Sequence, residues 1–409
     1  MERAAGDRID ETLAKLRRVT TSGRYLPEID GIRFIAIASV FLFHVTRLLY
    51  DEYPSNRVPF GAVRPHDLVG RFLREGRFGV MVFFALSGFI LALPFVSELL
   101  GGGKRVSLRA YFRRRVTRIE PPYLVALLVV ALLAAATDAW GPSDGVAGRL
   151  LVGAWYGHTI VHGVPNVLNP PFWTLEIEVQ FYLVMPLLAL VCFRGSRRVR
   201  RAAIAIAAIA ATLVQVSMGA RLGPGHPLGI LPSYLQWFLI GFLVADAFVV
   251  DWGGAPPQRR AWDLVTLVGW PAFFFLGANE DALSYVILPW LLLPLFVAVF
   301  RGPATRRALA NRWVTTIGGM TYSIYLIHAP VIELIGRRTT SWFPSYSSGT
   351  ILLQAVVLAP AVLAAGLLFY VLIERPCMDP RWPERLRRRL RRARPERDDL
   401  GSPEEAVAV

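Results

Sequence analysis

Long uncharged stretches are the feature that most constrains how this chain folds. Apolar windows of about 18 to 25 residues alternate with short basic segments, and an α-helix of about 20 apolar residues crosses the roughly 30 Å of hydrocarbon in a bilayer. The composition agrees, because 54% of the 409 residues are apolar and only 18% are charged. We therefore expect an all-α, polytopic transmembrane helix bundle.

The apolar windows predict about ten membrane spans. They cover residues 31–49, 78–97, 119–137, 172–193, 202–218, 231–250, 262–277, 283–300, 314–335 and 349–373. An even number of spans places both termini on the same side of the membrane. We divide the chain into a short N-terminal segment (1–30), a transmembrane domain (31–376) and a basic, disordered tail (377–409).

The placement of positive charge predicts the orientation. Of the 45 Lys and Arg residues, 34 lie in segments on the side of the termini and nine on the other side, and the remaining two lie within the first span. Cytoplasmic loops are enriched in Lys and Arg, so both termini are predicted to be cytoplasmic. The formal net charge of +15 follows from this topology, and the basic run 385–394 is suited to anionic lipid headgroups rather than nucleic acid.

Ionisable side chains inside membrane spans are functional candidates, because burying them in hydrocarbon costs free energy. In the first span, Arg33 and His44 are eleven residues apart and share one helix face, about 16 Å apart along the axis. Arg33 is predicted at the cytoplasmic end and His44 beyond the midplane. A lone histidine in a span also has a simpler interpretation, as a core residue bonded to a neighbour.

The fourth span carries Glu178, predicted about 9 Å below its outer end and at a depth similar to that of His44. An imidazole and a carboxylate at matching depth are typical of a general base and the group that orients it. Tyr182 follows Glu178 by four residues and shares its face. A purely structural bond between His44 and Glu178 is the alternative. Trp173, at the start of this span, is a further candidate.

Two more groups complete the candidate site. Arg115 and Arg118, in the basic loop before the third span, are spaced to face the same way, and arginine is suited to binding phosphate. Ordinary enrichment of arginine on the cytoplasmic side is the alternative explanation. In the ninth span, Tyr325 and His328 lie one turn apart, where contact with an acceptor and simple packing are both open.

No metal site is expected. His158 and His162 are four residues apart, but a third ligand is missing nearby, and zinc sites need at least three protein ligands. The two cysteines, Cys192 and Cys377, are expected to be reduced.

Six motifs in order make the chain similar to the acyltransferase-3 family of integral membrane acyltransferases. The resemblance covers residues 25–376. The motifs are Asp30-Gly-Ile-Arg33 with ten residues before His44, the segment Phe78–Phe89, Arg115-x-x-Arg118, the segment Trp173–Tyr182, the segment Ser323–His328 and Glu374-Arg375-Pro376. The chain departs from the family pattern at Thr174, Glu176 and Val179, where serines and a second acidic residue are usual.

The resemblance implies an O-acyltransferase that uses acyl-CoA as donor substrate, without a permanently bound cofactor, and a hydroxyl as acceptor. It implies that Arg33, Arg115 and Arg118 bind the anionic CoA head. His44 would then act as base and Glu178 would orient it, with Trp173, Tyr182, Tyr325 and His328 toward the acceptor or in supporting positions. We expect the protein in the bacterial plasma membrane, among lipids.

Two other functions stay open at this point. A transporter or flippase of an acylated glycan or lipid would use His44 and Glu178 as a proton relay. A non-catalytic scaffold would keep the buried charges for stability alone. The acceptor, the acyl chain length, an acyl-enzyme intermediate and the oligomeric state are not determined by the sequence.

Overall fold

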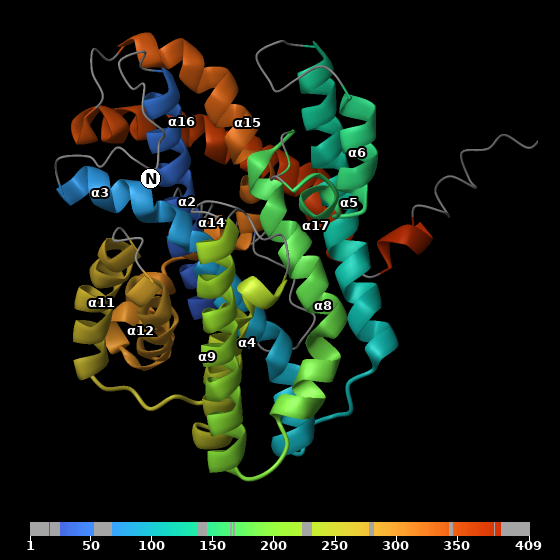
Figure 1. The fold of residues 1–409 in the computed structure, drawn as a ribbon, viewed down its shortest axis with the longest axis vertical. Helices are drawn as coiled ribbons and strands as arrows, with labels where there is room; N and C mark the ends of the chain where they lie inside the picture. Colours follow the sequence, from blue (N-terminus) through green and yellow to red (C-terminus); the bar gives the residue numbers. More distant parts are fainter. Residues whose placement is uncertain are drawn as a thin grey trace, which may run out of the picture.

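A computed structural model shows a bundle of helices (Figure 1). It describes residues 16, 25–52, 68–136, 145–163, 166, 168–222, 231–277, 282–342, 347–379 and 381–385, and these contain no strand. The all-α prediction is therefore confirmed. Most of the terminal segments 1–30 and 377–409 lies outside the described residues.

In the described part of the chain, eleven helices form the body of the bundle. They are α2 (Pro27–Glu52), α4 (Gly79–Leu100), α5 (Leu108–Ala136), α8 (Trp173–Cys192), α9 (Arg197–Leu222), α10 (Leu235–Asp246), α11 (Ala261–Gly277), α12 (Ala282–Arg301), α14 (Arg312–Gly319), α15 (Thr321–Thr339) and α16 (Ser348–Phe369). Two π-helical turns continue them, η4 (Ala247–Asp251) after α10 and η6 (Tyr370–Glu374) after α16.

Shorter pieces connect these helices. They are α3 (Leu68–Arg74), η1 (Glu75–Phe78), α6 (Val146–Ala154), α7 (His158–His162), η2 (Pro170–Phe172), η3 (Leu231–Ser233), α13 (Pro303–Leu309), η5 (Thr340–Trp342) and α17 (Arg375–Cys377).

Seven helical stretches in the described part of the chain are long and apolar enough to cross a bilayer. They are Pro27–Asp51, Leu68–Leu100, Leu108–Ala136, Pro170–Cys192, Arg197–Ser217, Leu283–Arg301 and Ser348–Cys377. The three other predicted spans fall on α10, on α11 and on α14 with α15. The polytopic bundle is thus confirmed, whereas the count of ten spans and the side of the termini stay predictions.

Two boundaries differ from the expectation. The basic segment before the third span is not a loop, because Arg113 to Arg118 form part of the long helix α5. The predicted span 314–335 is divided at Met320 into α14 and α15. Close packing accompanies this break, since a Cβ atom at Gly318 would lie 1.8 Å from the carbonyl oxygen of Asp30 in α2.

Glycines fix the central pair of helices, α4 and α10. A Cβ atom at Gly88 would lie 2.1 Å from the carbonyl oxygen of Phe238, and one at Gly241 would lie 2.1 Å from the carbonyl oxygen of Ala85. Small residues let helix backbones approach this closely in membranes, where van der Waals packing drives association. Helix α4 also packs against α2 and α8, so it links the helices that carry the candidate residues.

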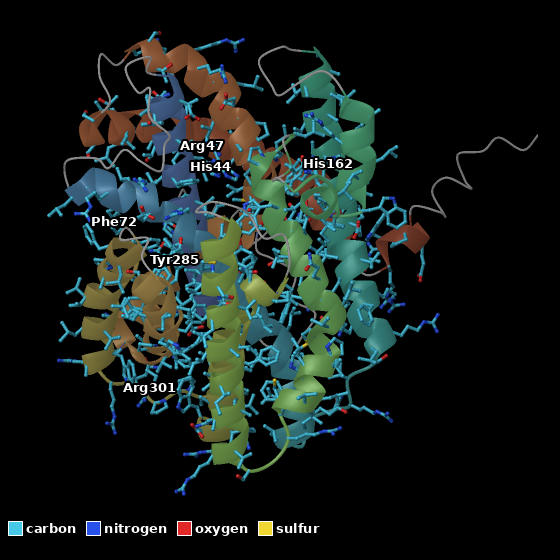
Figure 2. All side chains as sticks on the ribbon, viewed as in Figure 1. His44, Arg47, Phe72, His162, Tyr285 and Arg301 are labelled. Carbon is cyan, nitrogen blue, oxygen red and sulfur yellow. The ribbon has the colours of Figure 1, made fainter. Side chains whose placement is uncertain are left out.

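The remaining helices surround this centre. Helix α2 packs against α14 and α15, and α15 packs against α16. In Figure 1, α4, α8 and α9 occupy the lower half of the view, and α15 and α16 the upper half. Figure 2 shows His44 and Arg47 of α2 in that upper half and Arg301, at the end of α12, in the lower half.

Candidate functional site

One cavity collects most of the predicted site residues. Its walls come from α2, α4, α5, α8, α14, α15 and η6, and its empty volume is about 970 Å³. Six residues predicted from the sequence line it, namely Arg33, Arg115, Arg118, Glu178, Tyr182 and Tyr325.

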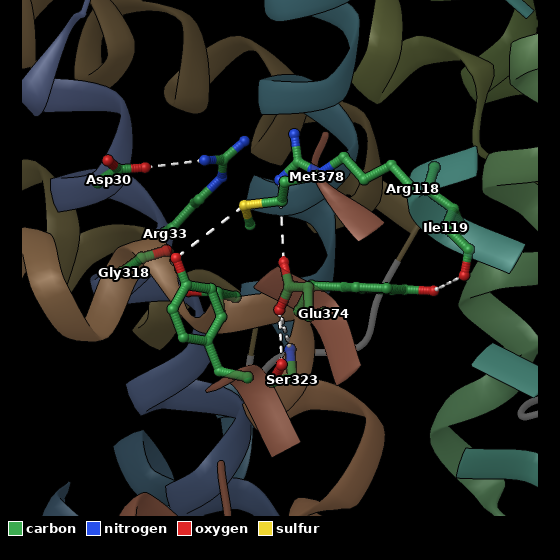
Figure 3. Close-up of polar contacts among 11 residues, drawn as sticks. Asp30, Arg33, Arg118, Ile119, Gly318, Ser323, Glu374 and Met378 are labelled. Atoms are coloured by element: carbon green, nitrogen blue, oxygen red, sulfur yellow. Dashed lines mark hydrogen bonds and ion pairs between the residues drawn. The ribbon is translucent and has the colours of Figure 1, made fainter. Parts of the chain in front are cut away.

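Two of the three cavity arginines lie beside buried carboxylates. Arg33 Nη1 lies 2.8 Å from Asp30 Oδ1, one turn earlier on α2. Arg118 Nη2 lies 3.9 Å from Glu374 Oε1, which comes from the other end of the domain (Figure 3). Each pairing reduces the cost of placing a guanidinium group within the bundle, while both arginines still face the cavity.

Arg115 contacts aromatic rings, whereas Arg33 and Arg118 lie beside carboxylates. Its guanidinium carbon lies 5.6 Å from the ring centre of Tyr111 and 5.9 Å from that of Tyr182, distances typical of cation–π contacts. Among the described residues no carboxylate lies within ion-pair distance of Arg115. Arg115 and Arg118 both line the cavity, as their spacing on α5 predicts. Within the described ranges, Arg115 therefore brings a positive charge to the cavity without a direct ion pair.

Glu178 is held by two hydroxyl groups. Ser87 of α4 donates a hydrogen bond to Glu178 Oε1 at 2.7 Å, and Tyr182 donates one to Oε2 at 2.6 Å. The predicted shared face of Glu178 and Tyr182 is confirmed by this contact. Because both carboxylate oxygens accept a hydrogen bond inside the cavity, the orientation of Glu178 is fixed.

The predicted contact between His44 and Glu178 is wrong, because the hydrogen-bond partners of Glu178 are Ser87 and Tyr182. The imidazole of His44 instead packs edge-on against the ring of His328, with 4.9 Å between ring centres. The reason is the arrangement of helices, since α2 packs against α15, whereas Glu178 on α8 faces Ser87 on α4. Matching depth on two helices does not determine which helices are neighbours.

His44 and His328 do not line the cavity, but His328 contacts Tyr325, which does. His328 Nδ1 lies 2.7 Å from the carbonyl oxygen of Tyr325, and because a carbonyl only accepts, Nδ1 carries the proton. The Tyr325 hydroxyl donates to the carbonyl oxygen of Pro171 at 2.7 Å and shares a 2.6 Å hydrogen bond with Thr174. Tyr325, which lines the cavity, thus connects His328 to the start of α8.

Trp173 packs against a residue that lines the cavity. Its ring lies 6.3 Å from Phe84, a cavity residue, and 5.2 Å from Tyr234. Trp173 itself does not line the cavity, and its part in the site stays a prediction. Glu176, three residues on, does not line the cavity and accepts a hydrogen bond from the backbone N–H of Thr159.

Four polar residues that were not selected from the sequence lie in or beside the site. They are Asp30, Ser87, Ser323 and Glu374. All four belong to the motifs described above, and that membership was the available signal, because only Ser87 and Ser323 lie inside predicted spans. Their partners lie on other helices or one turn away, and pairing of that kind does not follow from spacing along the chain.

The histidine pair and the cysteines considered from the sequence, His158, His162, Cys192 and Cys377, do not line the cavity. The described part of the chain contains no group of three or more His, Cys, Asp or Glu side chains that is arranged to hold a metal ion. His158 and His162 contact each other, with 4.6 Å between ring centres. Cys192 and Cys377 are free thiols.

Comparison with known proteins points to one chemistry. A family profile described as "Acyltransferase domain" matches residues 26–374. "Acyltransferase MdmB" of Streptomyces mycarofaciens is 29% identical over 385 residues, which cover 86% of this chain and 92% of the relative. "O-acetyltransferase OatA" of Staphylococcus aureus is 22% identical over 338 residues, 77% of this chain and 52% of that protein. No solved structure matches.

Proposed function

Since the chain belongs to the acyltransferase family whose domain it matches over residues 26–374, we propose that it is a membrane-embedded O-acyltransferase. It moves an acyl group from cytoplasmic acyl-CoA to a hydroxyl of a carbohydrate, a cell-surface glycan or a glycosylated secondary metabolite. One observation carries the proposal, namely that three guanidinium groups and the fixed carboxylate of Glu178 line a single cavity within the bundle. The name of the O-acetyltransferase relative supports an oxygen acceptor and a short acyl group such as acetyl.

The donor end of the cavity is the arginine cluster. CoA carries several phosphate charges, and guanidinium groups bind phosphate through paired hydrogen bonds. Arg33, Arg115 and Arg118 bind this head in the proposal. The apolar wall formed by residues such as Phe83 and Ile90 accommodates the uncharged arm and the acyl group. Acyl-CoA is consumed as a substrate, so no permanently bound cofactor is needed.

The chemistry uses His44 as general base. The imidazole takes the proton of the acceptor hydroxyl, whose oxygen then attacks the thioester carbonyl. The new C–O bond forms, the C–S bond breaks, and the CoA thiolate leaves and takes up a proton. Glu178 holds the Tyr182 hydroxyl in the donor cavity rather than orienting His44. Tyr325 and His328 lie toward the acceptor, with Trp173 in support.

The protein is a multi-pass membrane protein, and we place it in the bacterial plasma membrane with both termini in the cytoplasm. The excess of Lys and Arg on the side of the termini supports this orientation. A C-terminal reporter that is active only in the cytoplasm should therefore be active. Activity of a reporter that works only outside the cell would contradict the orientation.

The function is tested with purified protein in lipid nanodiscs, acetyl-CoA and a panel of glycan and glycoside acceptors. Release of free CoA thiol and acylated product, detected by mass spectrometry, are both expected. His44→Ala should abolish product formation while leaving CoA binding intact, because His44 acts on the acceptor. Folded protein that neither binds CoA nor consumes its thioester, or a His44→Ala variant with unchanged turnover, would refute the proposal.

A further inference from the structure

Glu374 is a carboxylate buried at the end of the membrane domain, far along the chain from the helices that bind the donor in our proposal. Its side chain has no exposed surface, and it lines the cavity. It is the last residue of the π-helical turn η6 (Tyr370–Glu374). Such turns insert an extra residue into an α-helix, change which side chain faces inward and occur frequently at functional sites.

Two hydrogen bonds from one residue hold this carboxylate in place. The backbone N–H of Ser323 donates to Glu374 Oε2 at 3.0 Å, and the Ser323 hydroxyl donates to the same oxygen at 2.6 Å. Ser323 is completely buried near the start of α15, so the position of Glu374 is tied to that helix. The network is visible in Figure 3.

The other oxygen of Glu374 is directed at Arg118. Glu374 Oε1 lies 3.9 Å from Arg118 Nη2, and the Arg118 side chain keeps 23% of its surface exposed. The backbone next to Arg118 is fixed as well, because Tyr322 donates a hydrogen bond to the carbonyl oxygen of Ile119 at 2.8 Å. Helices α5 and α15 and the turn η6 therefore meet at the guanidinium group of Arg118.

We infer that Glu374 is a positioning residue, which holds the guanidinium group of Arg118 at the orientation needed to bind the anionic head of the acyl donor. The inference rests on the proposed function, since it assigns Arg118 to the donor. Glu374 acts through Arg118 and does not contact the reacting atoms. Without it, Arg118 would sample several rotamers, and binding would have to order a long side chain at an entropic cost.

The direction in which Glu374 variants change the affinity for the anionic donor distinguishes a positioning role from a purely electrostatic one. Removing a negative charge from an anion-binding cavity strengthens anion binding if charge alone matters. A positioning role predicts the opposite result for Glu374→Gln, which has nearly the same shape. We expect Glu374→Gln to raise the KM for acetyl-CoA about fivefold and Glu374→Ala about tenfold, with kcat changed by less than about twofold. Ser323→Ala, which removes one of the two hydrogen bonds, should raise KM about threefold.

A double-mutant cycle with Arg118→Ala supplies the readout that a merely structural role would not move. If Glu374 acts through Arg118, adding Glu374→Ala to Arg118→Ala should change the Kd for CoA no further. Additive effects on Kd would overturn the inference. The matched control is Glu333→Gln, which breaks the exposed ion pair between Glu333 and Arg337 on α15 and should leave KM unchanged. Thermal unfolding of each variant identifies misfolded protein.

The failure of this inference and the failure of the proposed function give different results. If the wild-type protein binds CoA and Arg118→Ala weakens binding, while Glu374→Gln binds as tightly as wild type or more tightly, only the positioning role is wrong. If folded wild-type protein does not bind CoA in nanodiscs, the donor assignment is wrong and the positioning role fails with it.

Discussion

Ser87 donates a 2.7 Å hydrogen bond to Glu178, and this contact joins α4 to α8 at the wall of the cavity. It occupies the carboxylate oxygen that Tyr182 leaves free, since Tyr182 donates to the other one. A serine within a helix often bonds to the carbonyl of the preceding turn, whereas this one bonds across to a neighbouring helix. Glu178 is therefore fixed by hydrogen bonds from two helices. Because its partners are Ser87 and Tyr182, it does not orient His44.

Loss of the Ser87 hydroxyl should reduce turnover without affecting donor binding. In Ser87→Ala, Glu178 keeps only the hydrogen bond from Tyr182, and we expect kcat to fall about tenfold with an unchanged KM for acetyl-CoA. Steady-state kinetics in nanodiscs measures this. Ser217→Ala, which removes an exposed hydroxyl on α9, is the control. A Ser87→Ala variant with full kcat would show that the orientation of Glu178 is not limiting.

Tyr182 has two separable contributions, its hydroxyl on Glu178 and its ring beside Arg115. Tyr182→Phe keeps the ring and should lower kcat about tenfold while the KM for acetyl-CoA stays constant. Tyr182→Leu removes the ring as well and should also raise KM, because the guanidinium loses one cation–π contact. Equal kinetic parameters for the two variants would contradict this division.

Arg115→Lys tests the cavity arginine that contacts aromatic rings and has no ion-pair partner among the described residues. Lysine keeps the charge but loses the planar guanidinium, which stacks on rings and binds phosphate through two hydrogen bonds. We expect the KM for acetyl-CoA to rise about tenfold, with little change in kcat. Isothermal titration with CoA provides an independent Kd, and Arg198→Lys, at the exposed start of α9, is the control. Unchanged CoA affinity in Arg115→Lys would remove Arg115 from the donor site.

Gly88→Ala should destabilise the whole bundle. The added Cβ atom would lie 2.1 Å from the carbonyl oxygen of Phe238, so α4 and α10 would have to separate. Overpacking of this kind costs about 1 to 3 kcal/mol, and we expect a lower midpoint of thermal unfolding in detergent. Gly148→Ala in α6 is the control, because a Cβ atom there meets nothing within 4 Å. Equal midpoints for the two variants would show that α4 and α10 can adjust freely.

Residue spacing within one helix was a reliable guide to the site. The four-residue step from Glu178 to Tyr182 and the three-residue step from Arg115 to Arg118 both place side chains on a common face, and the structure confirms each. The periodicity of an α-helix is local, so such relationships follow from the chain alone.

Contacts between helices depend on more than local periodicity. The expected contact between His44 and Glu178 rested on equal depth, and the structure instead pairs His44 with His328 and Glu178 with Ser87. Glu374 lies 256 positions from Arg118 along the chain, and it reaches Arg118 because η6 meets α5. Equal depth in the membrane is not enough to bring two side chains together. Contact also requires that their helices are neighbours and that each helix is rotated so that the two side chains face each other.

The sequence by itself determined that this protein is a helical membrane bundle with basic charge gathered mainly on one side, because hydrophobic length and charge placement act along the chain. It also determined which polar residues share a helix face. Only the tertiary structure decided which faces meet, since close contacts such as Gly88 against Phe238 and Gly318 against Asp30 set the rotation and the neighbours of each helix. Those contacts arise from the packing of distant segments, and for that reason the cavity and its partners became visible only in the folded chain.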